Sequence, residues 1–204
     1  MLHLNLPPAA ASHFSALFSA GVGIKTIAGI SLTDLLCRQL AIDPEYVNQR
    51  VQTIFLNHRA VDRTEQVIVP AEAVLALSAA MPGLVGATFR KGGALADFRK
   101  DISYRDIPAP PPDGSHKETL ITLKLFNLVA RELGSHLLSL GVWIDRRTLA
   151  PLVAQILAAD PMPIQACRWN GRELSAVQLS GLKWPQGWIA LSVAWPQPNP
   201  PTSP

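Results

Sequence analysis

The chain has 204 residues, of which 48% are hydrophobic and 16% are charged, and its net charge at pH 7 is +3. That length suits one large domain or two small ones, and the apolar fraction is sufficient for ordinary hydrophobic cores. No uninterrupted apolar span is long enough to cross a bilayer, and Pro7-Pro8 interrupts an N-terminal apolar run that no positive charge precedes. The sequence therefore argues against a membrane span and a signal peptide, and it predicts a cytoplasmic protein.

The first half of the chain combines several short strand signals with one helix signal. Ser31 is a good N-cap for a helix whose apolar stripe runs to a stop at Asp43-Pro44. A hairpin turn is expected at Asn57-His58, because Asn tolerates a positive φ angle. The predicted strands cover residues 2–6, 22–27, 51–56, 60–61, 67–69 and 74–77.

The second half shows the same kinds of element. Thr148 is expected to cap a helix that Asp160-Pro161 stops, and Asn170-Gly171 is a strong hairpin turn. The predicted strands cover residues 121–126, 137–144, 164–169 and 188–193. Cys37 and Cys167 each lie in an apolar segment, so both are expected to be buried thiols in a reducing compartment, with a disulfide between them as the alternative.

The two halves resemble each other closely enough to indicate an internal duplication. The segments of residues 31–44 and 148–161 are identical at six of fourteen positions, including the Asp-Pro stop. The sequence GVGI at Gly21 matches GVWI at Gly141, and both halves place an Asn-x-Arg turn after the helix. Since the order of elements is also the same, the sequence favours two copies of one unit.

Residues 78–93 join the two halves and are rich in glycine. The five basic and two acidic residues between positions 88 and 105 carry the whole net charge, since the rest of the chain has thirteen charges of each sign. This connector is interpreted either as a solvated turn that needs glycine or as a contact site for an anionic partner. The candidate binding residues are Gly83, Gly86, Arg90, Lys91, Gly92, Gly93, Arg99, Lys100 and Arg105.

Each half also resembles the ThiS/MoaD-type β-grasp sulfur carriers. The strand and Asn turn of TIFLNHRAV, the strand near residues 72–77, the Gly92-Gly93 pair and the sequence ITLKLFNLVARELG carry this resemblance, with His58 standing where glycine is usual. The resemblance implies a ubiquitin-like fold, and in that family the two glycines form a C-terminus that becomes a thiocarboxylate. Here Ala94 follows Gly93, so sulfur carriage would need proteolysis after Gly93.

These observations predict an α+β fold of two tandem β-grasp units, each with one helix packed on a mixed sheet of about four or five strands. Residues 1–93 form the first unit with its Gly-Gly tail, residues 94–118 a basic and then proline-rich connector, and residues 119–195 the second unit. Residues 196–204 form a proline-rich tail that is expected to be disordered.

The predicted function is a non-enzymatic binding or adaptor module that contacts an anionic or protein partner through the connector. The alternatives are a latent sulfur carrier and an enzyme with a site between the units. The five histidines have no metal-ligand spacing and no acidic cluster beside them, so no metal, cofactor or catalytic residue is predicted. A phosphate-binding loop would require the GxxxxGK[ST] order, which is absent, and five cations are few for nucleic-acid binding.

Overall fold

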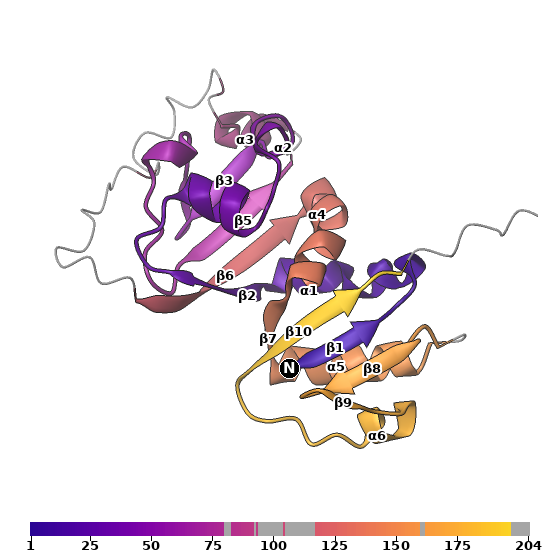
Figure 1. Ribbon diagram of the computed structural model, residues 1–204. Coiled ribbons are helices and arrows are strands. Elements are labelled where there is room, and N and C mark those ends of the chain that lie inside the picture. Colours follow the sequence, from indigo (N-terminus) through magenta and orange to yellow (C-terminus); the bar gives the residue numbers. More distant parts are fainter. Residues whose placement is uncertain (80–82, 92, 94–103, 105–116, 160–161, 197–204) are drawn as a thin grey trace, which may run out of the picture. The chain divides into compact units, whose positions relative to one another are not determined.

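The structure is a computed structural model that describes residues 1–79, 83–91, 93, 104, 117–159 and 162–196. It has a mixed α+β fold (Figure 1). The chain forms two compact units: unit 1 contains Met1–Leu17 and Leu133–Pro204, and unit 2 contains Phe18–Glu132. The boundary between the units falls inside α1 (Ser15–Ala20) and inside α4 (Asn127–Leu140).

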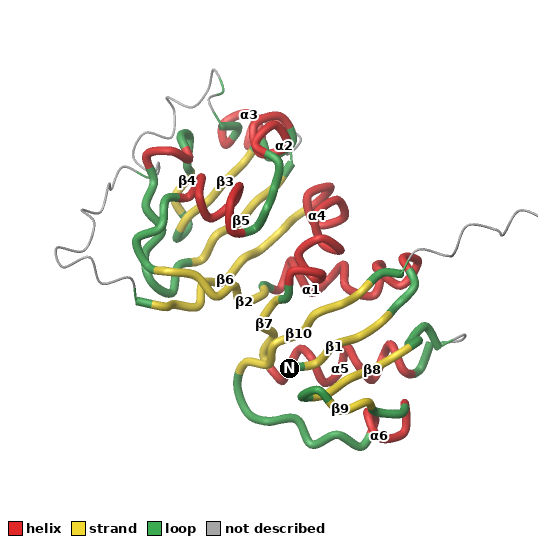
Figure 2. Tube along the Cα trace, in the orientation of Figure 1, coloured by secondary structure: helices red, strands yellow, loops and turns green. Residues whose placement is uncertain are grey.

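Unit 2 contains a five-stranded mixed sheet in the order β4-β3-β5-β6-β2 (Figure 2). Its strands are β2 (Val22–Ile27), β3 (Thr53–Leu56), β4 (Arg59–Ala60), β5 (Val74–Ser78) and β6 (Glu118–Phe126). The long strand β6 lies between β5, to which it is parallel, and β2, to which it is antiparallel. Its alternate residues Ile121, Leu123 and Leu125 are fully buried, so β6 contributes much of the core of this unit.

Three short helices follow one another between β2 and β5: η2 (Asp34–Gln39), α2 (Pro44–Gln49) and η3 (Thr64–Gln66). The predicted cap at Ser31 is confirmed, because its Oγ accepts a hydrogen bond of 3.0 Å from the backbone N–H of Asp34. The predicted stop at Asp43-Pro44 is wrong in part. Pro44 begins α2, where its missing N–H costs no helical bond, and Asp43 caps the helix.

Unit 1 contains the other five strands of the sheet order, β7-β10-β1-β8-β9. Its strands are β1 (Leu2–Asn5), β7 (Val142–Asp145), β8 (Ala166–Trp169), β9 (Arg172–Glu173) and β10 (Trp188–Ala194). Here β1 is central, parallel to β10 and antiparallel to β8. The helices of this part of the chain are η1 (Pro8–Phe14), α5 (Arg146–Leu157) and α6 (Ala176–Ser180).

The compact units do not coincide with the predicted units over residues 1–93 and 119–195, although the duplicated order of elements is present. In each half a strand, a helical segment, a glycine and a second strand follow one another, and both glycines, Gly21 and Gly141, have positive φ angles of 114° and 99°. However, β6 completes the sheet that carries β2–β5, and β1 completes the sheet that carries β7–β10. Each half therefore supplies one central strand to the unit built mainly from the other half.

Several local predictions also differ from the structure. Residues 137–140 belong to α4 and not to a strand, and α5 is capped by Asp145 instead of Thr148. Residues 8–20, where the sequence analysis predicts no element, form η1 and α1. The predicted strand over residues 67–69 forms only an isolated bridge between Ser31 and Ile68. The turns at Asn57-His58 and Asn170-Gly171 are confirmed, since all four residues have positive φ angles. Most of the predicted connector of residues 94–118 and most of the tail of residues 196–204 lie outside the described residues.

The strand exchange makes a prediction about tryptophan fluorescence, because all five tryptophans belong to unit 1: Trp143, Trp169, Trp184, Trp188 and Trp195. Leu4 of β1 is only 2% exposed. Leu4→Ala should lower the free energy of unfolding, followed by tryptophan fluorescence in urea, by about 2–5 kcal/mol because it opens a cavity. The control Leu140→Ala removes a side chain that is 49% exposed, and we expect a change within about 0.5 kcal/mol. An unchanged transition in Leu4→Ala would contradict the placement of β1.

Candidate functional site

The glycine-rich stretch forms a helix that packs on the sheet of unit 2. Gly83 begins α3 (Gly83–Phe89) with a φ angle of 78°, and Gly86 is buried within it. Phe89, at the end of α3, contacts Phe55 of β3 with ring centroids 5.2 Å apart. Since β3 alternates its side chains and Ile54 and Leu56 are buried, Phe55 and Phe89 meet on the other face of this sheet.

Lys91 is bonded within the fold. Its Nζ donates a hydrogen bond of 2.9 Å to the carbonyl of Val47 in the last turn of α2, and its backbone N–H donates to Gln52. This lysine therefore satisfies a carbonyl that the helix itself leaves unpaired. Desolvation lowers the pKa of the Lys91 amino group, and Glu65 partly opposes that shift. Arg90 is exposed, so the two cations of the predicted site have different surroundings.

The remaining predicted site residues are only partly described. The backbone N–H of Gly93 donates a hydrogen bond of 3.1 Å to the carbonyl of Arg90. Gly92, Arg99, Lys100 and Arg105 lie outside the described residues. The structure thus brings Gly83, Gly86, Lys91 and Gly93 together around α3, as part of the packing of unit 2.

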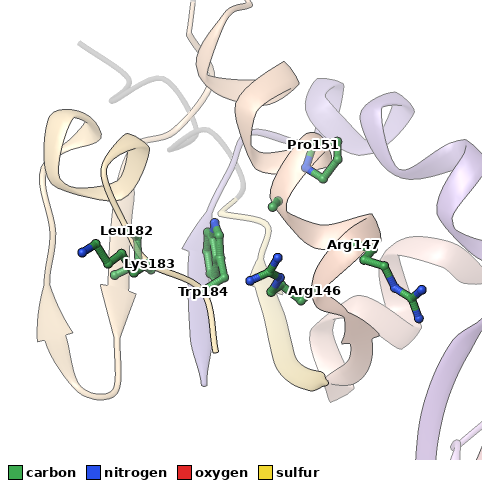
Figure 3. Close-up of a pocket in the computed structure, with 7 residues that line it drawn as sticks. Arg146, Arg147, Pro151, Leu182, Lys183 and Trp184 are labelled. Carbon is green, nitrogen blue, oxygen red and sulfur yellow. The ribbon is translucent and has the colours of Figure 1, made fainter. Parts of the chain in front are cut away.

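Unit 1 contains a groove of about 610 Å³ that the sequence analysis did not single out (Figure 3). Its lining comes from the first turns of α5 and from the segment between α6 and β10, and consists of Arg146, Arg147, Ala150, Pro151, Leu182, Lys183 and Trp184. Three of these residues are cationic, one is aromatic and three are apolar. No acidic side chain is among these lining residues.

Local contacts hold the two walls of this groove in place. The backbone N–H of Arg146 donates a hydrogen bond of 2.9 Å to the carbonyl of Gly187, which ties the start of α5 to the chain that enters β10. The ring of Trp184 meets that of Trp169 edge to face, with centroids 5.5 Å apart. A capping box between Ser175 and Gln178 starts α6, so the segment that carries Lys183 leaves a defined helix end.

The cations of the groove are not equivalent. Arg147 pairs with Asp145, with 3.1 Å between Nε and Oδ1, and this contact holds the pKa of the Asp145 carboxyl below its usual value. In Figure 3 Arg146 extends toward Trp184, whereas Arg147 extends to the other side of α5. In the same figure the amino group of Lys183 extends away from Trp184. Arg146 and Trp184 therefore form the part of the groove that can receive an anionic group beside an aromatic surface, and Lys183 lines the groove next to Trp184 in the chain.

Comparison of the chain with protein-family models, curated proteins and solved structures found no match. Among the described residues, no three histidine, cysteine or acidic side chains are grouped closely enough to hold a metal ion. Over the same part of the chain, none of the helices has both the length and the hydropathy that a membrane crossing requires. Both cysteines are free thiols, and burial raises the pKa of Cys167.

Sequence reasoning missed this groove because its residues carry only a weak signal. Arg146-Arg147 and Lys183-Trp184 are each an ordinary dipeptide, and 35 residues lie between Arg147 and Lys183. The available signal was that Lys183 and Trp184 stand beside a proline just before the last strand.

A polar cluster in unit 2 ties α2 to α4. Glu132 accepts a hydrogen bond of 2.7 Å from the hydroxyl of Tyr46, and it forms an ion pair with Arg50. The hydrogen bonds from Arg50 and Tyr46 lower the pKa of Glu132, whereas desolvation and the bond to Glu132 raise the pKa of Tyr46. These contacts therefore link α2, through Tyr46 and the following Arg50, to Glu132 of α4.

The lowered pKa of Glu132 predicts a pH dependence of stability. A carboxyl whose pKa is lower in the folded state stabilises the fold above its unfolded pKa of about 4.5, and that stabilisation is lost as the pH falls through the folded pKa. Glu132→Gln should therefore reduce the free energy of unfolding in urea near neutral pH, and the difference from the wild type should shrink below about pH 4.5. Arg50→Gln should weaken the same pH dependence. A constant difference across the acid range would contradict this assignment.

Proposed function

We propose that the protein is a non-enzymatic binding module of the β-grasp type, and that the groove of unit 1 binds an acidic segment of a partner protein. The strand order supports the β-grasp part of this proposal. In unit 2 the parallel pair β5 and β6 lies between the antiparallel neighbours β3 and β2, and in unit 1 the parallel pair β10 and β1 lies between β7 and β8. In the chain, helical segments connect β2 to β3 and β7 to β8, which lie on opposite sides of these parallel pairs. The ThiS/MoaD-like resemblance of the sequence agrees with that arrangement.

The observation that carries the functional part is the combination of Arg146, Lys183 and Trp184 in one groove. Carboxylates pair well with guanidinium and ammonium groups, while Trp184 and the apolar wall of Ala150, Pro151 and Leu182 can bury an adjoining side chain. A volume of about 610 Å³ is within the range of ligand sites and suits a few residues of an extended segment. An acidic peptide with an apolar residue fits both features.

This location differs from the connector that the sequence predicts, although the class of partner is the same. Lys91 is already bonded to Val47, so the groove offers cations in a better position than the described part of the connector does. The small net charge of +3 does not favour nucleic acid, which needs a broad basic surface. The prediction of a latent sulfur carrier cut after Gly93 receives no additional support from the described residues. Intact-mass spectrometry of the natural protein tests it.

The groove can be tested with a short fluorescein-labelled peptide rich in glutamate that contains one central phenylalanine. The double variant Arg146→Glu/Lys183→Glu should weaken binding, followed by fluorescence anisotropy, by at least about tenfold because it reverses two attractive charges. Trp184→Ala should also weaken binding, and added salt should reduce the effect of the charge reversals.

The matched control is Lys117→Glu, which reverses an exposed charge in unit 2. It should bind the peptide as the wild type does. An equal loss per reversed charge in Lys117→Glu and in the groove variant would mean that the peptide responds only to net charge, and the groove would then not be the site. A peptide with glutamine in place of glutamate serves as the second control, and it should not bind.

A further inference from the structure

A second group of polar side chains lies on the face of the unit 1 sheet that α5 does not cover. In β1, Leu2 and Leu4 are buried, so the alternation of the strand directs His3 and Asn5 to the opposite face. In Figure 1 the strands β1 and β8 lie in front of α5. The side chains of His3 and Asn5 thus leave the sheet on the side away from the packed core.

The strand register brings a cation and a hydroxyl next to His3. Arg168 of β8 and Ser192 of β10 both lie directly opposite this histidine. Asn5 has an alanine on either side, Ala166 and Ala194, and these short side chains leave a hollow of about 230 Å³. The residues that line this hollow are His3, Leu4, Asn5, Ala166, Cys167, Arg168 and Ala194.

Asn5 contributes a hydrogen-bond acceptor that lacks a partner. Its Oδ1 atom is buried and has no hydrogen bond, one of two such side-chain atoms among the described residues. Buried polar atoms in folded proteins nearly always have a partner, because an unpaired one costs free energy. Because Asn5 lines the hollow, a ligand that carries an N–H or O–H donor would supply the missing partner.

Arg168 and His3 supply the complementary part of the site. Arg168 donates from Nη2 to Glu173 at 3.0 Å, but both side chains are exposed, and such pairs are weak. A guanidinium has five donors, so Arg168 can bind a second carboxylate as well. The Nδ1 atom of His3 is 2.6 Å from Oγ of Ser192, and this contact fixes the imidazole that forms one wall.

We propose that this hollow binds a small carboxylate that also carries an N–H or O–H donor, with Arg168 bonding the carboxylate and Asn5 accepting from the donor. The volume is below the usual range for drug-sized ligands, so the ligand class is that of a single N-acylated amino acid or a hydroxy acid. This site is separate from the groove lined by Arg146 and Lys183, and it does not depend on the function proposed for that groove.

The test is a titration of the ¹⁵N-labelled full chain with N-acetylglycinate, followed by NMR. We expect saturable shifts in the backbone signals of β1, β8 and β10, together with the side-chain amide of Asn5. Acetate has the carboxylate but no N–H donor, so it should bind about tenfold more weakly. Arg168→Met should weaken N-acetylglycinate by at least about tenfold, and Glu173→Gln should tighten it because it removes the competing carboxylate.

Three comparisons make the result decisive. Arg146→Glu changes the other groove and should leave the titration unchanged, and tryptophan fluorescence in urea verifies that each variant is folded. Asn5→Ala should remove the preference for N-acetylglycinate over acetate. The proposal is overturned if the shifts do not saturate, if folded Arg168→Met binds as the wild type does, or if acetate binds as tightly as N-acetylglycinate.

Discussion

The fold depends on one constraint: β1 and β6 each lie between two strands that the other half of the chain supplies in whole or in part. A central strand has backbone groups on both edges, and these groups must find partners when water is excluded. β1 obtains its partners from β8 and β10, and β6 obtains them from β2 and β5. Neither half of the sequence can therefore complete its own sheet.

Both candidate sites follow from the way unit 1 is completed. The hollow beside Asn5 exists because β1 inserts between β8 and β10 with alanines opposite Asn5 on both sides. The cationic groove exists because α5 follows β7 directly and the chain entering β10 is bonded to the start of that helix through Gly187. In unit 2, by contrast, α3 packs against the sheet through Phe89, and its following lysine is bonded to α2.

The sequence was sufficient to predict most strands and both hairpin turns, because alternation and Asn at positive φ are local signals. The sequence was insufficient to predict the end of α4. Its residues 137–140 stand just before the strand of residues 142–145, and the apolar run is compatible with either a helix or a strand. The sequence also could not show which strands pair with each other, because pairing between residues 4 and 167 leaves no local pattern. The groove was missed for the same reason, since Arg146 and Lys183 meet only through the tertiary fold.

The exchange of strands can be tested most directly by a cysteine cross-link between β1 and β8. Leu4 lies directly opposite Cys167, so Leu4→Cys in a Cys37→Ser background places two cysteines at a separation that suits a disulfide. After refolding with oxidised glutathione, mass spectrometry should find an intramolecular disulfide between positions 4 and 167, and much less for Leu2→Cys, which lies opposite Trp169. A Leu4→Cys protein that refolds without this disulfide, or forms it no more readily than Leu2→Cys does, would contradict the exchanged-strand fold.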